Sequence, residues 1–113
     1  MKIKNKKILK GTVVYLKKVS GRVYKIKNKR DLANFKKNYI LVTSSLEPYM
    51  STALSKAKAI ICDKGGVFSH AAIVARELLI PCIVNTRKAT KLLKNEDYIM
   101  IKKDGSIWLK LKN

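Results

Sequence analysis

Apolar residues alternate with polar ones, or form short blocks, along most of the chain. This period and block length favour β-strands, because successive side chains on a strand point to opposite faces. We expect strands at residues 11–16, 22–26, 39–42, 59–62, 82–84, 98–102 and 107–111. Helical spacing and start signals predict helices or helical turns at residues 31–37, 47–56, 69–78 and 90–94. With turns at Ser20-Gly21 and Asp104-Gly105, strands alternate with helices in the middle and pair locally at both ends, which indicates an α/β domain.

The chain of 113 residues suffices for a single domain, which we assign to residues 1–113. Hydrophobic residues make up 47%, so a core can form. Residues 1–7 are mostly basic and polar, and we expect them to form a ragged end. The longest apolar run, residues 71–75, is too short for a membrane span or a signal peptide. We therefore expect a cytoplasmic protein with no membrane contact.

The formal net charge of +19 raises nucleic acid as a partner, but the distribution of the charge argues against it. Residues 1–37 carry 14 basic side chains and one acidic one, whereas residues 38–85 carry four and three. The basic residues are 22 Lys and 4 Arg, and nucleic-acid sites depend on Arg and on aromatic rings, which are only 7% here. We expect a solvated lysine-rich surface rather than a nucleic-acid site. Attraction to an acidic protein partner stays open.

The segment richest in chemical signals begins with Gly65-Gly66 and passes through Ser69 and His70, the only histidine, into an Ala-rich helix. A helix N-terminus after a strand and a glycine loop presents N–H groups that, together with the helix dipole, bind anions. Ser69 is suited to be the N-cap, and the glycines let the backbone approach a ligand closely. We therefore assign a phosphate-binding pocket to Gly65, Gly66 and Ser69.

An imidazole at this position has a chemical consequence. The positive end of the dipole disfavours the imidazolium form, so a ring nitrogen stays available as a nucleophile. The same N–H groups would stabilise the charge of a phosphoryl group on His70. The plain alternative is that His70 packs at a helix start and the glycines form a turn. A metal site is not expected, because one His and two separated Cys lack any usual ligand spacing.

This segment resembles the mobile phosphohistidine domain of phosphoenolpyruvate-utilising enzymes. These enzymes include phosphoenolpyruvate synthase, pyruvate phosphate dikinase, enzyme I of the sugar phosphotransferase system and rifampicin phosphotransferase. The residues that carry the resemblance are Gly65-Gly66, Val67, Phe68, Ser69-His70, the helix from Ala71 to Ala75-Arg76, and Ile80-Pro81. A weaker likeness around residues 8–23, 40–48 and 104–105 extends it to residues 8–111.

The resemblance implies an α/β fold of a particular kind, a swivelling β/β/α layered domain with a mixed sheet and a helix after the Gly-Gly-x-x-Ser-His loop. It implies a phosphoryl carrier, transiently phosphorylated on His70, that serves ATP- or phosphoenolpyruvate-dependent partner domains and an acceptor. Such a chain is a phosphotransferase component that needs nucleotide-binding or phosphoenolpyruvate/pyruvate-binding partners. It would bind no cofactor itself, and Mg-ATP or phosphoenolpyruvate would be held by those partners.

Three further residues are candidates for the same site. The hydroxyl groups of Thr43 and Ser44 could hold a phosphoryl group on His70, although turn chemistry explains them equally well. Arg76 lies six positions after His70, which is more than one helical turn. Docking or support is therefore as good a role for Arg76 as contact with phosphate.

Five further residues that could have a chemical role are better explained by ordinary packing or solvation. Cys62 and Cys82 lie in apolar strands, which favours buried thiols over redox centres. Glu47 and Asp63 could orient His70, but a solvated carboxylate explains each of them better. Trp108 is expected to pack at the core or at an edge rather than to stack with a ligand.

Three departures from the family pattern leave other functions open. Phe68 stands where Thr is usual, Leu79 where a Gly commonly closes the helix, and Asn85 where a Gly usually follows the strand. A left-handed cap is costly for Leu, so the helix end must differ or be strained. The alternatives are a non-catalytic docking or regulatory module of the same fold and, ranked below it, a basic nucleic-acid-binding domain. The sequence does not determine the donor, acceptor, pathway or oligomeric state.

Overall fold

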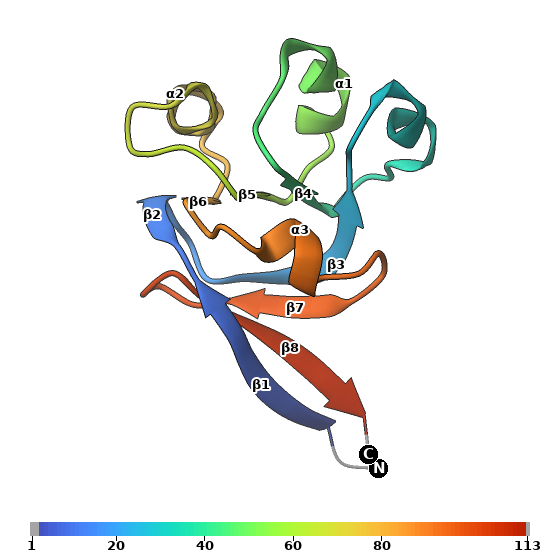
Figure 1. Ribbon diagram of the computed structural model, residues 1–113, viewed down its shortest axis with the longest axis vertical. Coiled ribbons are helices and arrows are strands. Elements are labelled where there is room, and N and C mark those ends of the chain that lie inside the picture. Colours follow the sequence, from blue (N-terminus) through green and yellow to red (C-terminus); the bar gives the residue numbers. More distant parts are fainter. Residues whose placement is uncertain (1–2, 113) are drawn as a thin grey trace.

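The computed structural model describes residues 3–112 and consists of a mixed sheet with short helices around it (Figure 1). Its strands are β1 (Ile3–Lys10), β2 (Thr12–Tyr15), β3 (Val19–Lys25), β4 (Ile40–Thr43), β5 (Ala59–Cys62), β6 (Cys82–Val84), β7 (Tyr98–Ile101) and β8 (Ser106–Lys112). Across the sheet the order is β1-β8-β7-β3-β4-β5-β6-β2. Strands β3 to β6 are parallel to one another, whereas the remaining pairs are antiparallel.

The helices of the described residues are short. They are the 3₁₀ helices η1 (Lys29–Asn34) and η2 (Pro48–Met50) and the α-helices α1 (Ser51–Leu54), α2 (His70–Leu78) and α3 (Ala89–Leu92). In Figure 1, η1, α1 and α2 lie on one side of the parallel strands, and α3 lies on the other side.

Two hydrophobic cores account for this layering. One lies between the parallel strands and the helices, and it includes Leu41, Ile60 and Ala75. The other lies between the parallel strands and the antiparallel strands β7 and β8, and it includes Ile61 and Ile101. Because side chains alternate along a strand, β4 and β5 contribute to both cores. The layers are therefore antiparallel strands, parallel strands and helices, which confirms the predicted β/β/α fold.

The helix predictions are confirmed in place but not in every boundary. The helix predicted at residues 69–78 is α2, and η2 with α1 replaces the single helix predicted at residues 47–56. The turn predicted to start at Asp31 is η1, which begins earlier because Asn28 is its N-cap. The Asn28 side chain accepts the Arg30 amide at 3.0 Å, and the Asp31 carboxylate accepts the Asn28 amide at 3.2 Å. This reciprocal pair is a capping box.

The ragged end predicted for residues 1–7 is wrong from Ile3 onward. Strand β1 begins there and pairs with β8, with Lys6 opposite Leu109 and Lys7 opposite Trp108. Lysine side chains keep their ammonium groups in water while the backbone joins the ladder, so basic composition does not prevent a strand at a sheet edge. Residues 1 and 2 lie outside the described part of the chain.

The turn predicted at Ser20-Gly21, with the strands on either side of it paired to each other, is also wrong. These residues lie within β3, where Gly21 pairs with Ile99 of β7. Strand β2 lies at the far edge of the sheet and pairs with β6. The turn-forming residue types are present, but the pairing of β3 with β7 and β4 keeps the segment extended.

The closing hairpin is confirmed, because β7 and β8 pair on either side of Asp104-Gly105. Gly105 has a φ of +86°, a left-handed conformation that favours glycine. The Asp104 carboxylate accepts the Ser106 amide at 2.9 Å. These interactions are local, so the sequence suffices to predict this turn.

Candidate functional site

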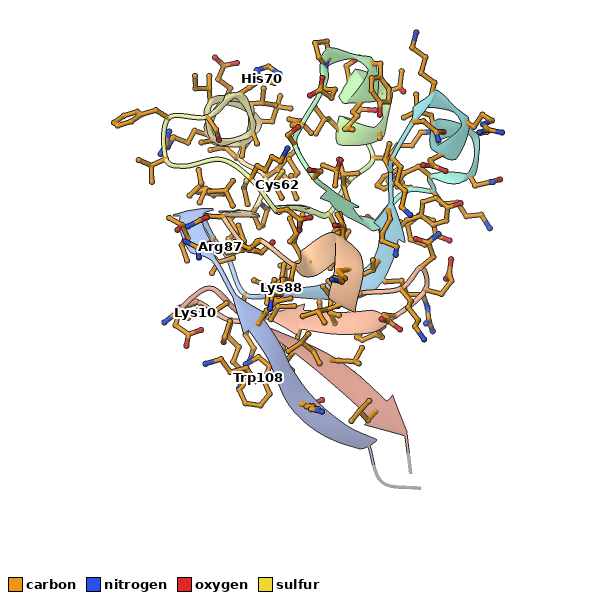
Figure 2. All side chains as sticks on the ribbon, in the orientation of Figure 1. Lys10, Cys62, His70, Arg87, Lys88 and Trp108 are labelled. Atoms are coloured by element: carbon orange, nitrogen blue, oxygen red, sulfur yellow. The ribbon has the colours of Figure 1, made fainter. Side chains whose placement is uncertain are left out.

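His70 is the first residue of α2, and the preceding loop determines how it is presented. The chain leaves β5 at Cys62 and turns through Gly65, whose φ of +104° is readily adopted only by glycine. Ser69 is the N-cap of α2, and its Oγ accepts the Ala72 amide at 3.3 Å. The His70 side chain is exposed and lies in the helical layer, at the top of Figure 2. The predicted helix start and N-cap are therefore confirmed.

A pocket of about 150 Å³ lies beside His70. Its lining consists of Ser45, Leu46, Lys64, Gly65, Ser69, His70 and Ala71. Three of the predicted site residues, Gly65, Ser69 and His70, are thus brought together. The N-terminal amides of α2, the hydroxyl groups and the Lys64 ammonium are all suited to hold an anion.

Sequence reasoning missed Ser45 and Lys64 as site residues. Strands β4 and β5 are adjacent and parallel, so the loops that follow them leave the sheet at the same edge. The Lys64 amide donates to the Ser44 carbonyl at 2.9 Å, which holds the two loops together. Ligands of parallel sheets bind at the carboxyl ends of the strands, so this rule could have pointed to the two loops, although not to which of their polar side chains line the pocket.

The pocket beside His70 does not include Thr43, Ser44 or Gly66 among its lining residues. Thr43 is buried, and its hydroxyl donates to the Ile26 carbonyl at 2.9 Å. Thr43 and Ser44 line a separate pocket of about 330 Å³. Gly66 is exposed, and a Cβ added to it would meet no atom within 4 Å. Contact of these three residues with phosphate stays a prediction.

Arg76 and Asp63 have supporting positions. Arg76 lies in the last turn of α2, where a cation interacts favourably with the helix dipole. It lies six positions after His70, which is about 9 Å along a helix axis. The Asp63 carboxylate is directed toward α3, where it accepts the Thr90 amide at 3.1 Å and is also bonded to the Thr90 hydroxyl. Asp63 therefore holds α3 in place instead of orienting His70.

His70 also borders a larger, mostly apolar groove of about 530 Å³. Residues of η2, α1 and α2 line it, namely Glu47, Pro48, Ser51, Leu54, Ser55, His70, Val74, Glu77 and Leu78. His70 is thus shared by a small polar pocket and an apolar groove. The imidazole can meet an anion on one side while a larger apolar group occupies the other.

The three departures from the family pattern leave His70 at the helix start. Phe68 is 88% exposed in the loop that precedes α2. Leu79 is the C-cap of α2 with φ 57° and ψ 43°, so the helix ends in the left-handed cap that is costly for Leu. Asn85 also has a positive φ, 56°, which Asn tolerates better than most residues.

Cys62 and Cys82 are both buried free thiols, as predicted. Desolvation raises the pKa of each thiol to about 12. Within residues 3–112, no three His, Cys, Asp or Glu side chains gather where they could hold a metal ion. The helices of that same part of the chain all fall short of the length and apolar character that a membrane span requires.

Comparison with known proteins identifies a common domain. Residues 35–105 match the family described as "PEP-utilising enzyme, mobile domain". The chain is 46% identical over 87 residues to phosphoenolpyruvate synthase of Pyrococcus furiosus. These aligned residues make up 77% of this chain and 10% of that protein. It is 43% identical over 105 residues to a probable phosphoenolpyruvate synthase of Methanothermobacter thermautotrophicus. In this case the aligned residues make up 92% of this chain and 15% of that protein. The chain therefore spans only a small part of the length of these relatives.

Solved structures share the arrangement of strands and helices. An NMR solution structure of Enzyme I matches with a TM-score of 0.57 and 25% identity, over 69% of this chain and 33% of that chain. The holo-form of Thermococcus kodakaraensis aconitase X matches with a TM-score of 0.65, over 92% of this chain and 98% of that chain. At 16% identity this second likeness shows the fold alone. From the family match and the identity to the synthases, the chain belongs to the mobile domains of PEP-utilising enzymes.

Proposed function

We propose that this chain is a phosphoryl carrier that is transiently phosphorylated on His70. The observation that carries the proposal is the exposed imidazole at the first position of α2, beside a pocket of amide, hydroxyl and ammonium donors. Donors of this kind stabilise the negative charge that the imidazole gains on phosphorylation. Membership of the mobile-domain family supports the same role.

In the transfer step, a nitrogen of the His70 ring attacks the phosphorus atom of the donor. The N–P bond forms as the P–O bond to the leaving group breaks, and the electron pair leaves with that oxygen. An acceptor oxygen then attacks the same phosphorus, and the electron pair of the N–P bond returns to the ring. Lys64 and the N-terminal amides of α2 hold the phosphoryl oxygens, so catalysis consists of positioning and charge stabilisation.

The donor and acceptor sites belong, in this proposal, to partner domains that bind Mg-ATP, phosphoenolpyruvate or pyruvate. The support is that the chain spans 10% and 15% of two relatives named as phosphoenolpyruvate synthases. The groove beside His70 and the exposed Phe68 supply apolar surface on which a partner can dock. The transfer would take place in the cytoplasm.

Phosphoryl labelling tests the assignment. The full chain is incubated with Pyrococcus furiosus phosphoenolpyruvate synthase and with labelled ATP or labelled phosphoenolpyruvate. We expect an acid-labile phosphoryl group on the wild-type chain and none on His70→Asn. Asn34→Ala, which changes an exposed polar residue of η1, should label like the wild type. Label that survives His70→Asn refutes the assignment.

The second candidate is a non-catalytic docking module, which the 88% exposure of Phe68 favours. Such a module would bind the synthase without acquiring label from either donor. Binding of that kind would have to weaken in Phe68→Ser and persist in His70→Asn. This combination of results would replace the carrier proposal.

A further inference from the structure

The antiparallel strands carry a second surface, far from His70. Ile99, Ile101 and Ile107 point into the core between the layers. Because side chains alternate along a strand, their neighbours lie on the opposite side of the sheet. We call that side the outer sheet face and define it by Lys7, Arg22, Tyr98, Lys102, Trp108 and Lys110. In Figure 1 the helices of the described residues lie on the other side of these strands, so the face is open.

Hydrogen bonds to serine hold both aromatic rings of the outer sheet face. The Trp108 Nε1–H donates to Ser106 Oγ at 2.9 Å, and that hydroxyl bonds to Asp104 Oδ1 at 2.5 Å. The Tyr98 hydroxyl pairs with the Ser20 hydroxyl at 3.2 Å. The rings are therefore fixed in orientation on a rigid sheet, which lowers the entropy cost of stacking a ligand on them.

Cations lie against the same two rings. Lys102 Nζ is 4.0 Å from the centroid of the Trp108 ring, and Lys110 Nζ is 4.4 Å from the centroid of the Tyr98 ring. Arg22 Cζ is 5.6 Å from the Tyr98 centroid. Rings and cations thus alternate over neighbouring strands.

Strand register assembles this group from distant parts of the sequence. Lys7 of β1 pairs with Trp108 of β8, and Arg22 of β3 pairs with Tyr98 of β7. Directly paired residues place their side chains on the same face. Three lysines from distant parts of the chain, Lys7, Lys102 and Lys110, are therefore brought together around two aromatic rings, which the sequence pattern did not reveal.

We propose that the outer sheet face binds single-stranded nucleic acid. The phosphates would pair with the ammonium and guanidinium groups, and two bases would stack on Trp108 and Tyr98 after the lysines move from the rings to the phosphates. A duplex keeps its bases stacked inside and offers only phosphates to this face. An acidic protein surface would pair with the cations, but it would not stack on the two ring faces as bases do. The combination of fixed rings and cations therefore favours a single strand over both.

This binding is independent of the proposed phosphoryl transfer. His70 lies at the top of the molecule in Figure 2, and Trp108 lies toward the opposite end. A ligand on the outer sheet face leaves the pocket beside His70 open. Variants of one site therefore report on that site alone.

The first measurement is fluorescence anisotropy of the full chain with a labelled oligouridylate of about 16 nucleotides, a length within the range that one binding domain covers. Four cations on the face predict that log K falls with log salt with a slope of about −3, because each neutralised phosphate of a single strand contributes about −0.7. Lys102→Gln combined with Lys110→Gln should reduce the steepness of this slope by about 1.4. The matched pair Lys56→Gln with Lys91→Gln, at exposed sites near α1 and in α3, should leave the slope nearly unchanged.

The second measurement tests the rings. Trp108→Leu and Tyr98→Leu keep an apolar side chain but remove the stacking surface, and each should weaken binding about tenfold. His70→Asn should bind like the wild type. If circular dichroism finds that Trp108→Leu is unfolded, Tyr98→Leu and the lysine pair decide the outcome.

Three results would overturn the proposal. The first is the absence of saturable binding at low salt. The second is equal loss of binding in the Lys56/Lys91 pair and the Lys102/Lys110 pair. The third is binding of poly-L-glutamate or of a duplex as tightly as the oligouridylate, with no effect of either ring variant, because that result assigns the face to anions in general.

Discussion

The two adjacent glycines before α2 have different surroundings, so alanine should affect them differently. Gly65 has a φ of +104°, and a Cβ there would lie 2.9 Å from Ser69 Oγ and 3.1 Å from Ser69 Cβ. Gly66 has no such backbone restriction, and a Cβ there would meet nothing within 4 Å. Gly65→Ala therefore strains the backbone and displaces the N-cap of α2, whereas Gly66→Ala does neither.

The magnitudes follow from these contacts. A left-handed backbone costs alanine about 1–2 kcal/mol, and loss of the Ser69 cap costs about 1 kcal/mol. Gly65→Ala should therefore lower the free energy of unfolding by about 2–3 kcal/mol. Gly66→Ala should raise it by about 0.4–1 kcal/mol, because alanine restricts the unfolded chain. At roughly 4 °C per kcal/mol for a domain of this size, Tm should fall by roughly 10 °C in the first variant and rise by roughly 2–4 °C in the second.

Thermal unfolding followed by circular dichroism measures both shifts. Phosphoryl labelling below both melting temperatures adds a functional readout, because displacement of Ser69 from the pocket should slow the labelling of Gly65→Ala. Equal shifts in Tm for the two variants, or a larger loss in Gly66→Ala, would refute the reasoning from the loop geometry.

Two further predictions concern the end of α2 and the buried thiols. Leu79→Gly should have a free energy of unfolding about 0.5–1 kcal/mol higher than Leu79→Ala, because relief of left-handed strain exceeds the entropy cost of glycine. At Leu78, which is helical, the order should reverse, and Leu78→Ala should be more stable than Leu78→Gly by a similar amount. Urea unfolding of the four variants measures this reversal, and the same order at both positions would contradict a left-handed cap. Burial raises the pKa of the Cys62 and Cys82 thiols to about 12, so at mildly alkaline pH very little of either thiol is in the reactive thiolate form. Ellman's reagent should therefore react with them only after unfolding, and rapid reaction of the native protein would argue against their burial.

Much of the candidate site could be predicted because its chemistry is local. Ser69 caps the helix through an amide three residues away, and His70 follows it directly. Gly65 turns the chain within the same loop. A helix start depends on residues that are close in sequence, so the types and order of these residues sufficed.

The rest of the pocket could not be predicted in the same way. Lys64 and Ser45 reach it because β4 and β5 are neighbours in the sheet. Thr43 also lies at the carboxyl end of β4, yet its hydroxyl donates a hydrogen bond to the Ile26 carbonyl in the interior. Which polar group at a strand end faces a pocket and which faces the interior is decided by packing across strands.

The sequence by itself determined the helix start at His70, the cap at Ser69 and the closing turn at Gly105. Steric limits and hydrogen bonds within a few residues account for each of them. Only the tertiary structure decided that β1 pairs with β8, that β2 pairs with β6, and that rings and cations share the outer sheet face. These pairings join segments distant in sequence. They satisfy the backbone hydrogen bonds of the paired strands and place Leu9 and Val13 against the core between the layers, while the lysines stay in water.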